Sequence, residues 1–456
     1  MKIHPSDNVV VHIEDGHKYA DCDIKKGETI VKYGFPIGHA ICDIEAGAHV
    51  HVHNMKTNLA GTLDYTYEPE FTELPYPKTD AYFQGYVREN GDVGIRNEIW
   101  IVNTVGCVNK TAQRLGELTG AKYFPHPFGC SQLGRDQTTT QQILRGLVNH
   151  PNAGGVLVLG LGCENNNIAA FQSVLGCYDE RRVRFLNTQD CADEIAEGTR
   201  IIRELRSYAD SFQRQRISAA RLRIGLKCGG SDGYSGITAN PLVGRVSDRL
   251  IAEGGSSVLT EVPEMFGAET VLMKRCIDRT VFDRTVRLIN DFKSYYQAHG
   301  QVIYENPSPG NKQGGITTLE EKSLGCVQKG GTASVVDVLD YGDTVSKCGL
   351  SLLNGPGNDL VAVTNLTAAG VHLILFTTGR GTPVGGPVPT VKISTNTKLY
   401  TQKSSWIDFD AGAVLQGEDL TDELFAYILD VASGTRTKNE QNGYSEISIF
   451  KDGVTL

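Results

Sequence analysis

The stretch Arg221–Pro241, RLRIGLKCGGSDGYSGITANP, constrains the fold of this chain of 456 residues more than any other. Apolar residues at 222, 224 and 226 alternate with polar or small ones, which is typical of a β-strand. From Cys228 onward, glycines and small polar residues can continue neither a strand nor a helix. Open α/β sheets bind ligands at loops that follow the carboxyl ends of strands. The stretch therefore predicts an α/β fold with a ligand site here, and a plain structural turn is the alternative.

The same order of strand, loop and helix recurs along the chain. NEIWIVNTVGC (97–107) predicts a strand followed by a helix over Lys110–Thr119, and GGVLVLGLGCENN (154–166) predicts a strand buried on both faces. VHLILFTT (371–378) predicts a further strand, and Glu269–His299 a long helical region. We interpret Asp193–Tyr208 and the following RQRISAARL as helical. This rhythm is typical of parallel βαβ units.

The composition excludes several classes of function. A net charge of −9 argues against a nucleic-acid partner held through its phosphates. No apolar run reaches the length of a membrane span, and MKIHPSDNVV does not resemble a signal peptide, so we expect a cytoplasmic protein. Eleven cysteines without CxxC pairs favour buried thiols, or metal and catalytic groups, over disulfides.

Residues 1–60 predict a small β module, with short strands at Asn8–Ile13, Glu28–Lys32, Ala40–Ile44 and Ala48–His53. Residues 61–84, rich in Pro, Tyr and acids, are interpreted as a linker. His49, His51 and His53 alternate, so in a strand all three would lie on one face. That spacing is typical of metal ligands. It fits an exposed polar face of a strand equally well. His17 lies in a predicted loop, where it is free to act.

Cysteines follow several predicted strands. Cys107, Cys130, Cys163 and Cys228 all lie at glycine-flanked breaks. Because the carboxyl ends of parallel strands share one edge, these thiols could converge, and converging thiolates bind iron or zinc. Since cysteine is more often an inert buried residue, Glu164 is the better candidate for catalysis or substrate contact.

A second polar loop, YENPSPGNKQGGITTLEEKSLG (304–325), leads into a predicted helix whose start is marked by Thr317 or Thr318. Lys312 could hold a carboxylate as a point charge, or act as a base if its pKa were lowered. The alternative is a surface lysine. The prolines and Gly310 would restrict this loop, which favours a functional role.

These stretches carry a family resemblance. The motifs GHKYA, YGFPIGHAICDI, GDVGIRNEIWI, GCSQLG, GLGCENN, CGGSDGYSGITANP, EVPEMFGAE, NPSPGNKQGGITTLEEKSLG, TTGRGTPVGG and WIDFDAG resemble the altronate dehydratase family of sugar-acid dehydratases, nearly end to end. The resemblance implies an N-terminal SAF-type β-clip domain, an α/β domain over 85–220 and a Rossmann-like α/β domain over 221–456. It also implies ferrous iron, with manganese as a substitute. We expect a small sugar acid as the partner, no nucleic acid and no membrane, and the choice between a monomer and a homodimer stays open.

The resemblance also implies a reaction: D-altronate loses water to give 2-keto-3-deoxy-D-gluconate. Galactarate or another sugar acid is an alternative substrate, and a non-catalytic sugar-acid sensor is the alternative of another class. We expect Lys312 or His17 as the base, with Glu321 or Glu164 near the metal. The expected substrate contacts are Ser231, Asp232, Thr238, Asn240 and Asn311. The metal ligands would be His49 and His51, or instead Cys130, Cys163 and Cys228.

Overall fold

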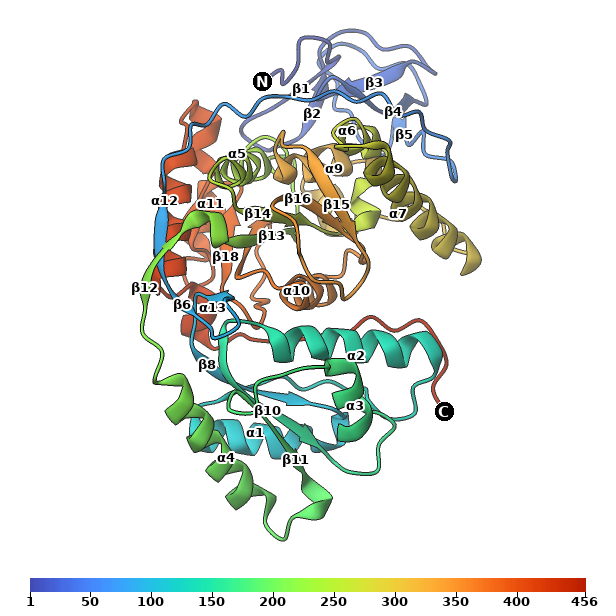
Figure 1. Ribbon diagram of the computed structural model, residues 1–456. Helices are drawn as coiled ribbons and strands as arrows, with labels where there is room; N and C mark the ends of the chain where they lie inside the picture. The colour runs from blue at the N-terminus through green and yellow to red at the C-terminus, as the bar shows by residue number, and fades with distance from the viewer.

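A seven-stranded parallel sheet organises the C-terminal half of the computed structural model, which describes residues 1–456 (Figure 1). Every neighbouring pair of strands in it runs parallel. The strand order is β15 (Val335–Leu339), β16 (Gly349–Leu353), β14 (Ser256–Leu259), β13 (Arg223–Cys228), β17 (Leu373–Thr378), β18 (Thr390–Ser394) and β19 (Phe409–Asp410). The strand expected at the start of Arg221–Pro241 is thus confirmed as β13, at the centre of the sheet.

Helices cover both faces of this sheet, because its strands are apolar on both. In β17, Leu373 and Leu375 belong to one hydrophobic cluster, whereas Ile374 and Phe376 belong to another. Helix α5 (Ala239–Ala252) buries its apolar residues in the first cluster, and α10 (Asp359–Ala368) contributes Leu366 to the second. The expected α/β class with parallel sheets is confirmed.

The middle domain is a smaller parallel sheet, ordered β11 (Val183–Asn187), β10 (Ala153–Gly160), β8 (Glu98–Asn103) and β9 (Lys122–Tyr123). Helices α1 (Asn109–Thr119) and α4 (Glu194–Ala209) pack on one face, with α2 (Gly134–Asn149) and α3 (Ile168–Leu175) on the other. Apolar residues of α2 and α10 lie in one cluster, so the middle and C-terminal domains share part of a core.

The chain enters and leaves the middle domain through one antiparallel sheet, in which β6 (Tyr82–Val87) lies between β7 (Val93–Gly94) and β12 (Gln215–Ser218). The helix expected over RQRISAARL is wrong: this segment forms β12 and a 3₁₀ turn. Pairing with β6 overrides the local preference of the sequence. The long helical region expected over Glu269–His299 consists of two helices, α6 (Glu269–Met273) and α7 (Arg279–Ala298).

The N-terminal module is a set of short antiparallel strands: β1 (Val9–Val11) with β2 (Lys18–Ala20), and β4 (Phe35–Ala40) between β3 (Thr29–Lys32) and β5 (Met55–Lys56). The strands expected at Ala40–Ile44 and Ala48–His53 are wrong, and His51 and His53 lie in a turn. Residues 57–81 form no helix or strand and run along the C-terminal domain, where the Tyr67 hydroxyl donates to the carbonyl of Cys276 at 2.9 Å.

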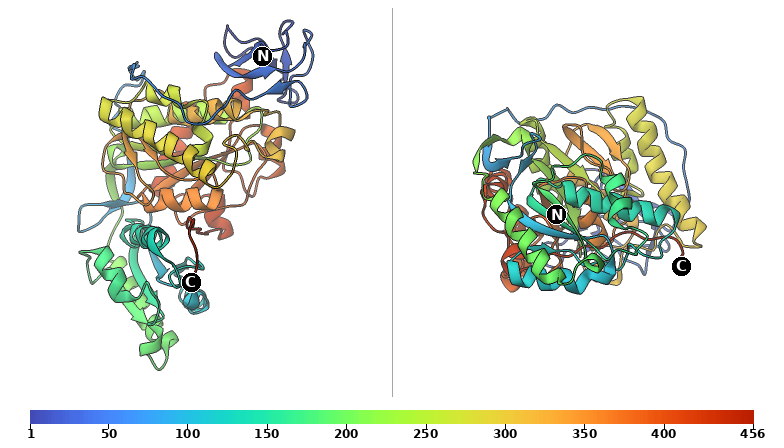
Figure 2. Two further views of the ribbon diagram at one scale, coloured as in Figure 1. Left: turned by 90° about the vertical axis from the view of Figure 1, so that its right-hand side faces the viewer. Right: turned by 60° about the horizontal axis from the view of Figure 1, so that its bottom comes forward.

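The three parts are stacked along one direction, with the N-terminal module at one end and the middle domain at the other (Figure 2). The remaining helices are α8 (Pro309–Gln313), α9 (Leu319–Cys326), α11 (Thr397–Gln402), α12 (Thr421–Ser433) and α13 (Lys438–Asn442). None of the helices combines the length and the apolar character that crossing a bilayer requires.

The N-terminal module docks on the glycine-rich loop after β13. A Cβ atom at Gly233 would overlap the carbonyl oxygen of Gly16. We therefore expect Gly233→Ala to lower the free energy of unfolding by about 1–3 kcal/mol through overpacking. Proteolysis within residues 57–81 should also become faster. Gly310→Ala is the matched control, since its Cβ would meet only Ser308 Oγ at 3.9 Å. Equal stabilities of the two variants would show that the docking contact is not tight.

Candidate active site

The ends of two neighbouring parallel strands and one helix meet at the candidate active site. Strand β13 ends at Cys228, and β14 is followed at once by Glu261 and Glu264. Parallel neighbours end at the same edge of the sheet, so these side chains converge. Helix α9 faces them with Cys326, and Thr318 caps its start by accepting from the amide of Glu321.

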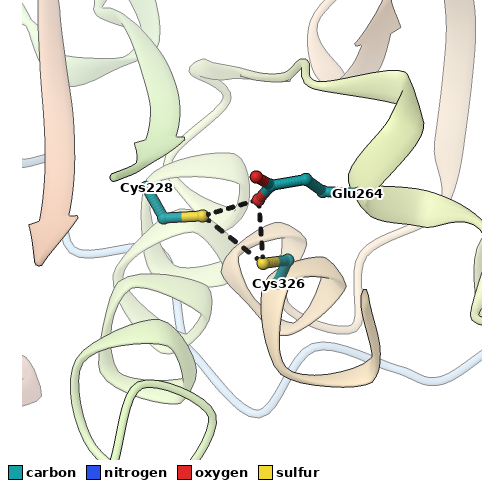
Figure 3. Close-up of side chains that lie close together, drawn as sticks. All are labelled: Cys228, Glu264 and Cys326. Atoms are coloured by element: carbon teal, nitrogen blue, oxygen red, sulfur yellow. Dashed lines mark hydrogen bonds between the residues drawn. The ribbon is translucent and has the colours of Figure 1, made fainter. Parts of the chain in front are cut away.

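Two thiols and a carboxylate form a buried cluster, which we call the Cys228/Glu264/Cys326 centre (Figure 3). The two sulfur atoms are 3.4 Å apart, and each lies 3.1 Å from Oε2 of Glu264. The three donor atoms lie within 4.8 Å of one another. Metal–sulfur bonds are about 2.3 Å long, so atoms this close can share one ion.

Lysines surround this centre and set its charge. Lys329 Nζ lies 2.9 Å from the sulfur of Cys228, and Lys322 Nζ lies 2.8 Å from Glu264. The hydrogen bond with the Cys326 thiol, assisted by Lys329, lowers the pKa of Cys228. Burial favours a protonated Glu264, but Lys322 and the neighbouring lysines prevail and lower its pKa. The lysines therefore favour the ionised forms of Cys228 and Glu264, although both groups are buried.

The donor set fits a divalent transition metal. Thiolate sulfur selects iron or zinc over magnesium or calcium, and a carboxylate oxygen also ligates ferrous iron. Three protein ligands leave coordination positions free for a substrate, as in catalytic metal sites. Because Lys227, Lys322 and Lys329 contact the donors or their neighbours, a cation is tolerated here only when both thiols are ionised.

An open polar cleft of about 520 Å³ lies over this centre. Its walls come from the loop after β13, from residues 305–312 and from Gly357 and Asp359. Ser308 caps α8 in a capping box with Asn311, which fixes the loop that carries Lys312. Lys312 lines the cleft, and its ammonium group makes no hydrogen bond or ion pair within the chain. The cleft therefore offers a free cation beside a buried anionic centre.

Of the residues expected from the sequence, Cys228, Asn311 and Lys312 meet at this cleft. Asp232, Thr238 and Asn240 do not line it, because their side chains hold the loop together. Asp232 accepts hydrogen bonds from Ser235, Thr395 and Asn396. Thr238 donates to the carbonyl of Thr395, and Asn240 to that of Gly325. Ser231 is also buried, and its carbonyl accepts from Asn311.

Glu321 does not lie at the cleft either. It is buried between Lys18 and Lys32 of the N-terminal module, each at 2.8 Å. Burial favours the neutral acid, but the two ammonium groups prevail and lower the pKa of Glu321 to about 2. Its neighbour Glu320 accepts from Thr57 of the same module at 2.8 Å. Helix α9 thus contacts the module on one face and the Cys228/Glu264/Cys326 centre on the other.

The histidines of the module form a second cluster. His17 Nδ1 lies 3.0 Å from His49 Nε2, and the rings of His49 and His51 are 5.4 Å apart. His51 Nδ1 lies 2.8 Å from the hydroxyl of Thr317. Burial, with help from Lys18, lowers the pKa of His51 to about 4, so this ring is neutral at neutral pH. These histidines do not line the cleft.

The expected convergence of Cys130, Cys163 and Cys228 is wrong. Cys130 and Cys163 are exposed in loops of the middle domain, whereas Cys228 is buried in the C-terminal domain. Glu164 belongs to the same middle-domain loops and accepts from the amides of Leu161 and Gly162 at 3.0 and 2.6 Å. Its carboxylate closes a turn at the end of β10 and is not at the cleft. The middle domain and the C-terminal domain each have their own parallel sheet, and the candidate site lies at the edge of the C-terminal sheet.

Glu264, Cys326 and Lys329 were not expected from the sequence. Lys322, Cys326 and Lys329 follow the spacing i, i+4, i+7 of one helical face. This spacing could have indicated that the three side chains lie together. EVPEMFGAE follows a predicted strand directly, as CGGSDG does, and could have indicated Glu264. Glu261 also has a left-handed backbone, with φ of 73°, which is uncommon outside glycine and typical of functional sites.

Comparisons with known proteins match each of the three parts of the chain. Residues 9–58 match the Altronate/galactarate dehydratase SAF domain, residues 85–210 the second domain of D-galactarate dehydratase/Altronate hydrolase, and residues 219–455 the D-galactarate/Altronate dehydratase C-terminal domain. The chain is 52% identical to an altronate dehydratase of Bacillus subtilis and 50% identical to one of Escherichia coli. In both cases the match covers 100% of this chain and 99% of the relative.

A more distant relative is the galactarate dehydratase (L-threo-forming) of Escherichia coli, 31% identical over 99% of this chain and 96% of its own. All three family matches follow one another in the order of the three structural parts. On this evidence, the chain belongs to the D-galactarate/altronate dehydratase family and is a sugar-acid dehydratase, a hydro-lyase.

Proposed function

We propose that this hydro-lyase acts in the cytoplasm on D-altronate and forms 2-keto-3-deoxy-D-gluconate and water, with ferrous iron, or manganese in its place, at the Cys228/Glu264/Cys326 centre. The identity to two altronate dehydratases, well above that to the galactarate enzyme, supports the substrate. The observation that carries the proposal is the unpaired side chain of Lys312 in a polar cleft above three converging donor atoms.

The reaction removes a proton from C2 and a hydroxyl from C3. The C2 proton lies beside a carboxylate and is barely acidic, so the enediolate that forms must be stabilised. When bound, the metal would supply a Lewis acid, with Cys228, Glu264 and Cys326 as its ligands. Lys312, as the neutral amine, takes the proton from C2 and becomes an ammonium group. That proton is then passed to the hydroxyl that leaves C3, so one water is released and the amine is restored. The enol then ketonises to the 2-keto acid.

Other residues orient these groups. Lys322 donates to Asn306 at 3.0 Å and pairs with Glu264, so it adds positive charge to the wall of the cleft without being free to move. Lys329 holds the thiolate of Cys228 in place. The buried position of the centre strengthens these interactions, because water screens them little.

The direct test is turnover under anaerobic conditions with added Fe²⁺. D-altronate, galactarate and further aldonates are incubated with the protein in parallel, and 2-keto acid is assayed. We expect D-altronate to be consumed with the highest kcat/KM. Preference for galactarate would overturn the substrate. Binding without turnover of any sugar acid would favour the sensor function, which the full-length similarity to enzymes already argues against.

Lys312 can be tested by a pair of substitutions. We expect Lys312→Met and Lys312→Arg both to lower kcat by about 10²–10⁴-fold, which is the usual contribution of a general base. Arginine keeps the positive charge but cannot release its proton at working pH. Activity of the arginine variant near that of the parent would show that Lys312 only binds the substrate carboxylate. Steady-state kinetics with D-altronate measures the difference.

A further inference from the structure

We propose that a second cleft, between the middle and C-terminal domains, binds a small oxyanion, a carboxylate or a phosphate. Its volume is about 710 Å³, within the range of small-molecule sites. It shares no lining residue with the cleft over Cys228. The middle domain contributes Arg88, Arg145 and Arg182, and the C-terminal domain contributes Arg223 and Gly370.

The positive charge of this cleft is not balanced within the chain. Five arginines and three acidic residues line it. Arg181 takes up two of the acids, Glu89 and Asp179, in ion pairs at the surface. The third acid, Asp92, lies 4.0 Å from Arg223. No carboxylate lies within ion-pair distance of Arg88, Arg145 or Arg182.

Arg88 and Arg182 are held in place by uncharged groups. Arg88 is buried and donates to the carbonyls of Pro151 and Arg96, each at 2.9 Å. Arg182 donates to the carbonyls of Ala153 and His150. Burial, together with repulsion from Arg182, lowers the pKa of Arg88 to about 9. Burial likewise lowers the pKa of Arg182 to about 10. An anion in the cleft would relieve this cost.

Free donors remain on these guanidinium groups. Arg223 Nε is buried and has no hydrogen-bond partner, although Nη2 contacts His372 at 3.3 Å. Arg182 Nη1 and the whole Arg145 side chain make no hydrogen bond within the chain. Guanidinium groups match the geometry of carboxylate and phosphate oxygens, often through two parallel hydrogen bonds. An unpaired buried donor is uncommon in folded proteins, and an oxyanion would satisfy it.

The site is tested by calorimetric titration of the full-length protein with inorganic phosphate and, separately, with succinate, at constant ionic strength. We expect saturable binding of at least one of them, and Arg145→Ala should weaken it at least tenfold. Arg145 makes no hydrogen bond in the chain, so its loss should not unfold the protein, and Arg145→Gln serves as a second variant. Arg203→Ala, an exposed arginine on α4 outside the cleft, is the matched control.

Lys312→Met separates this site from the active site and should leave the binding unchanged. The tighter of the two anions identifies whether phosphate or carboxylate is recognised. The proposal is overturned if neither anion binds saturably, if both Arg145 variants bind as the parent does, or if Lys312→Met abolishes the binding.

Discussion

Replacement of Cys228 by serine is expected to lower kcat by at least about 10³-fold. This corresponds to a loss of transition-state stabilisation of about 1.4 kcal/mol for each factor of ten. The hydroxyl of serine does not ionise under conditions where the Cys228 thiol does, so the centre loses one anionic donor. The iron bound per chain after anaerobic loading should fall from about one to near zero. Kinetics with D-altronate and metal analysis of the same sample provide the measurement.

Other cysteines supply the controls. Cys276→Ser alters a buried thiol whose hydrogen bonds go to Leu272 and Thr285, away from the centre, so it should keep its iron and most of its activity. Cys130→Ser and Cys163→Ser should behave like the parent, because both thiols are exposed in the middle domain. Loss of iron in these two variants, with iron retained in Cys228→Ser, would show that the metal binds in the middle domain.

Replacement of Glu321 by glutamine is expected to destabilise the protein by about 3–5 kcal/mol, because it leaves Lys18 and Lys32 buried without their counter-charge. The N-terminal module should become loose, and proteolysis within residues 57–81 should accelerate. Glu197→Gln is the matched control: water screens its exposed pair with Arg200, so its loss should change the stability little. Urea-induced unfolding measures both. A change in the Glu321 variant as small as in the control would contradict the role of this pair.

The same carboxylate predicts a dependence on pH. The pKa of Glu321 is lowered from 4.5 to about 2 in the folded protein. Its stabilisation is therefore complete above pH 4.5 and is lost as the pH falls through about 2. In Glu321→Gln this part of the acid dependence should vanish. Unfolding measured at a series of pH values, parent beside variant, shows whether the two curves converge at low pH.

Local patterns predicted much of the fold. The apolar runs of β10 and β17 are buried on both faces, and such runs identify central strands of parallel sheets. The N-terminal module was less predictable. His49, His51 and His53 alternate as in a strand, yet they lie at a bridge and a turn, where Asn54 fixes the backbone by accepting from the amide of His51. Short strands with many turns carry little periodic signal.

The candidate site was predicted only in part, because a sequence does not reveal which loops share an edge. Cys228, at the carboxyl end of β13, and Lys312, on α8, meet at the cleft as expected. Glu164 lies in an equally rich loop but on the other sheet. Glu320, Glu321 and Lys322 are consecutive in α9, so they point in different directions, and only Lys322 faces the centre.

The most direct test of this account is anomalous diffraction at the iron absorption edge from crystals grown anaerobically with Fe²⁺. The account predicts one strong anomalous peak between the sulfur atoms of Cys228 and Cys326 and the carboxylate of Glu264. A peak at His17 and His49, or one beside Cys130 and Cys163, with none at this centre, would contradict it.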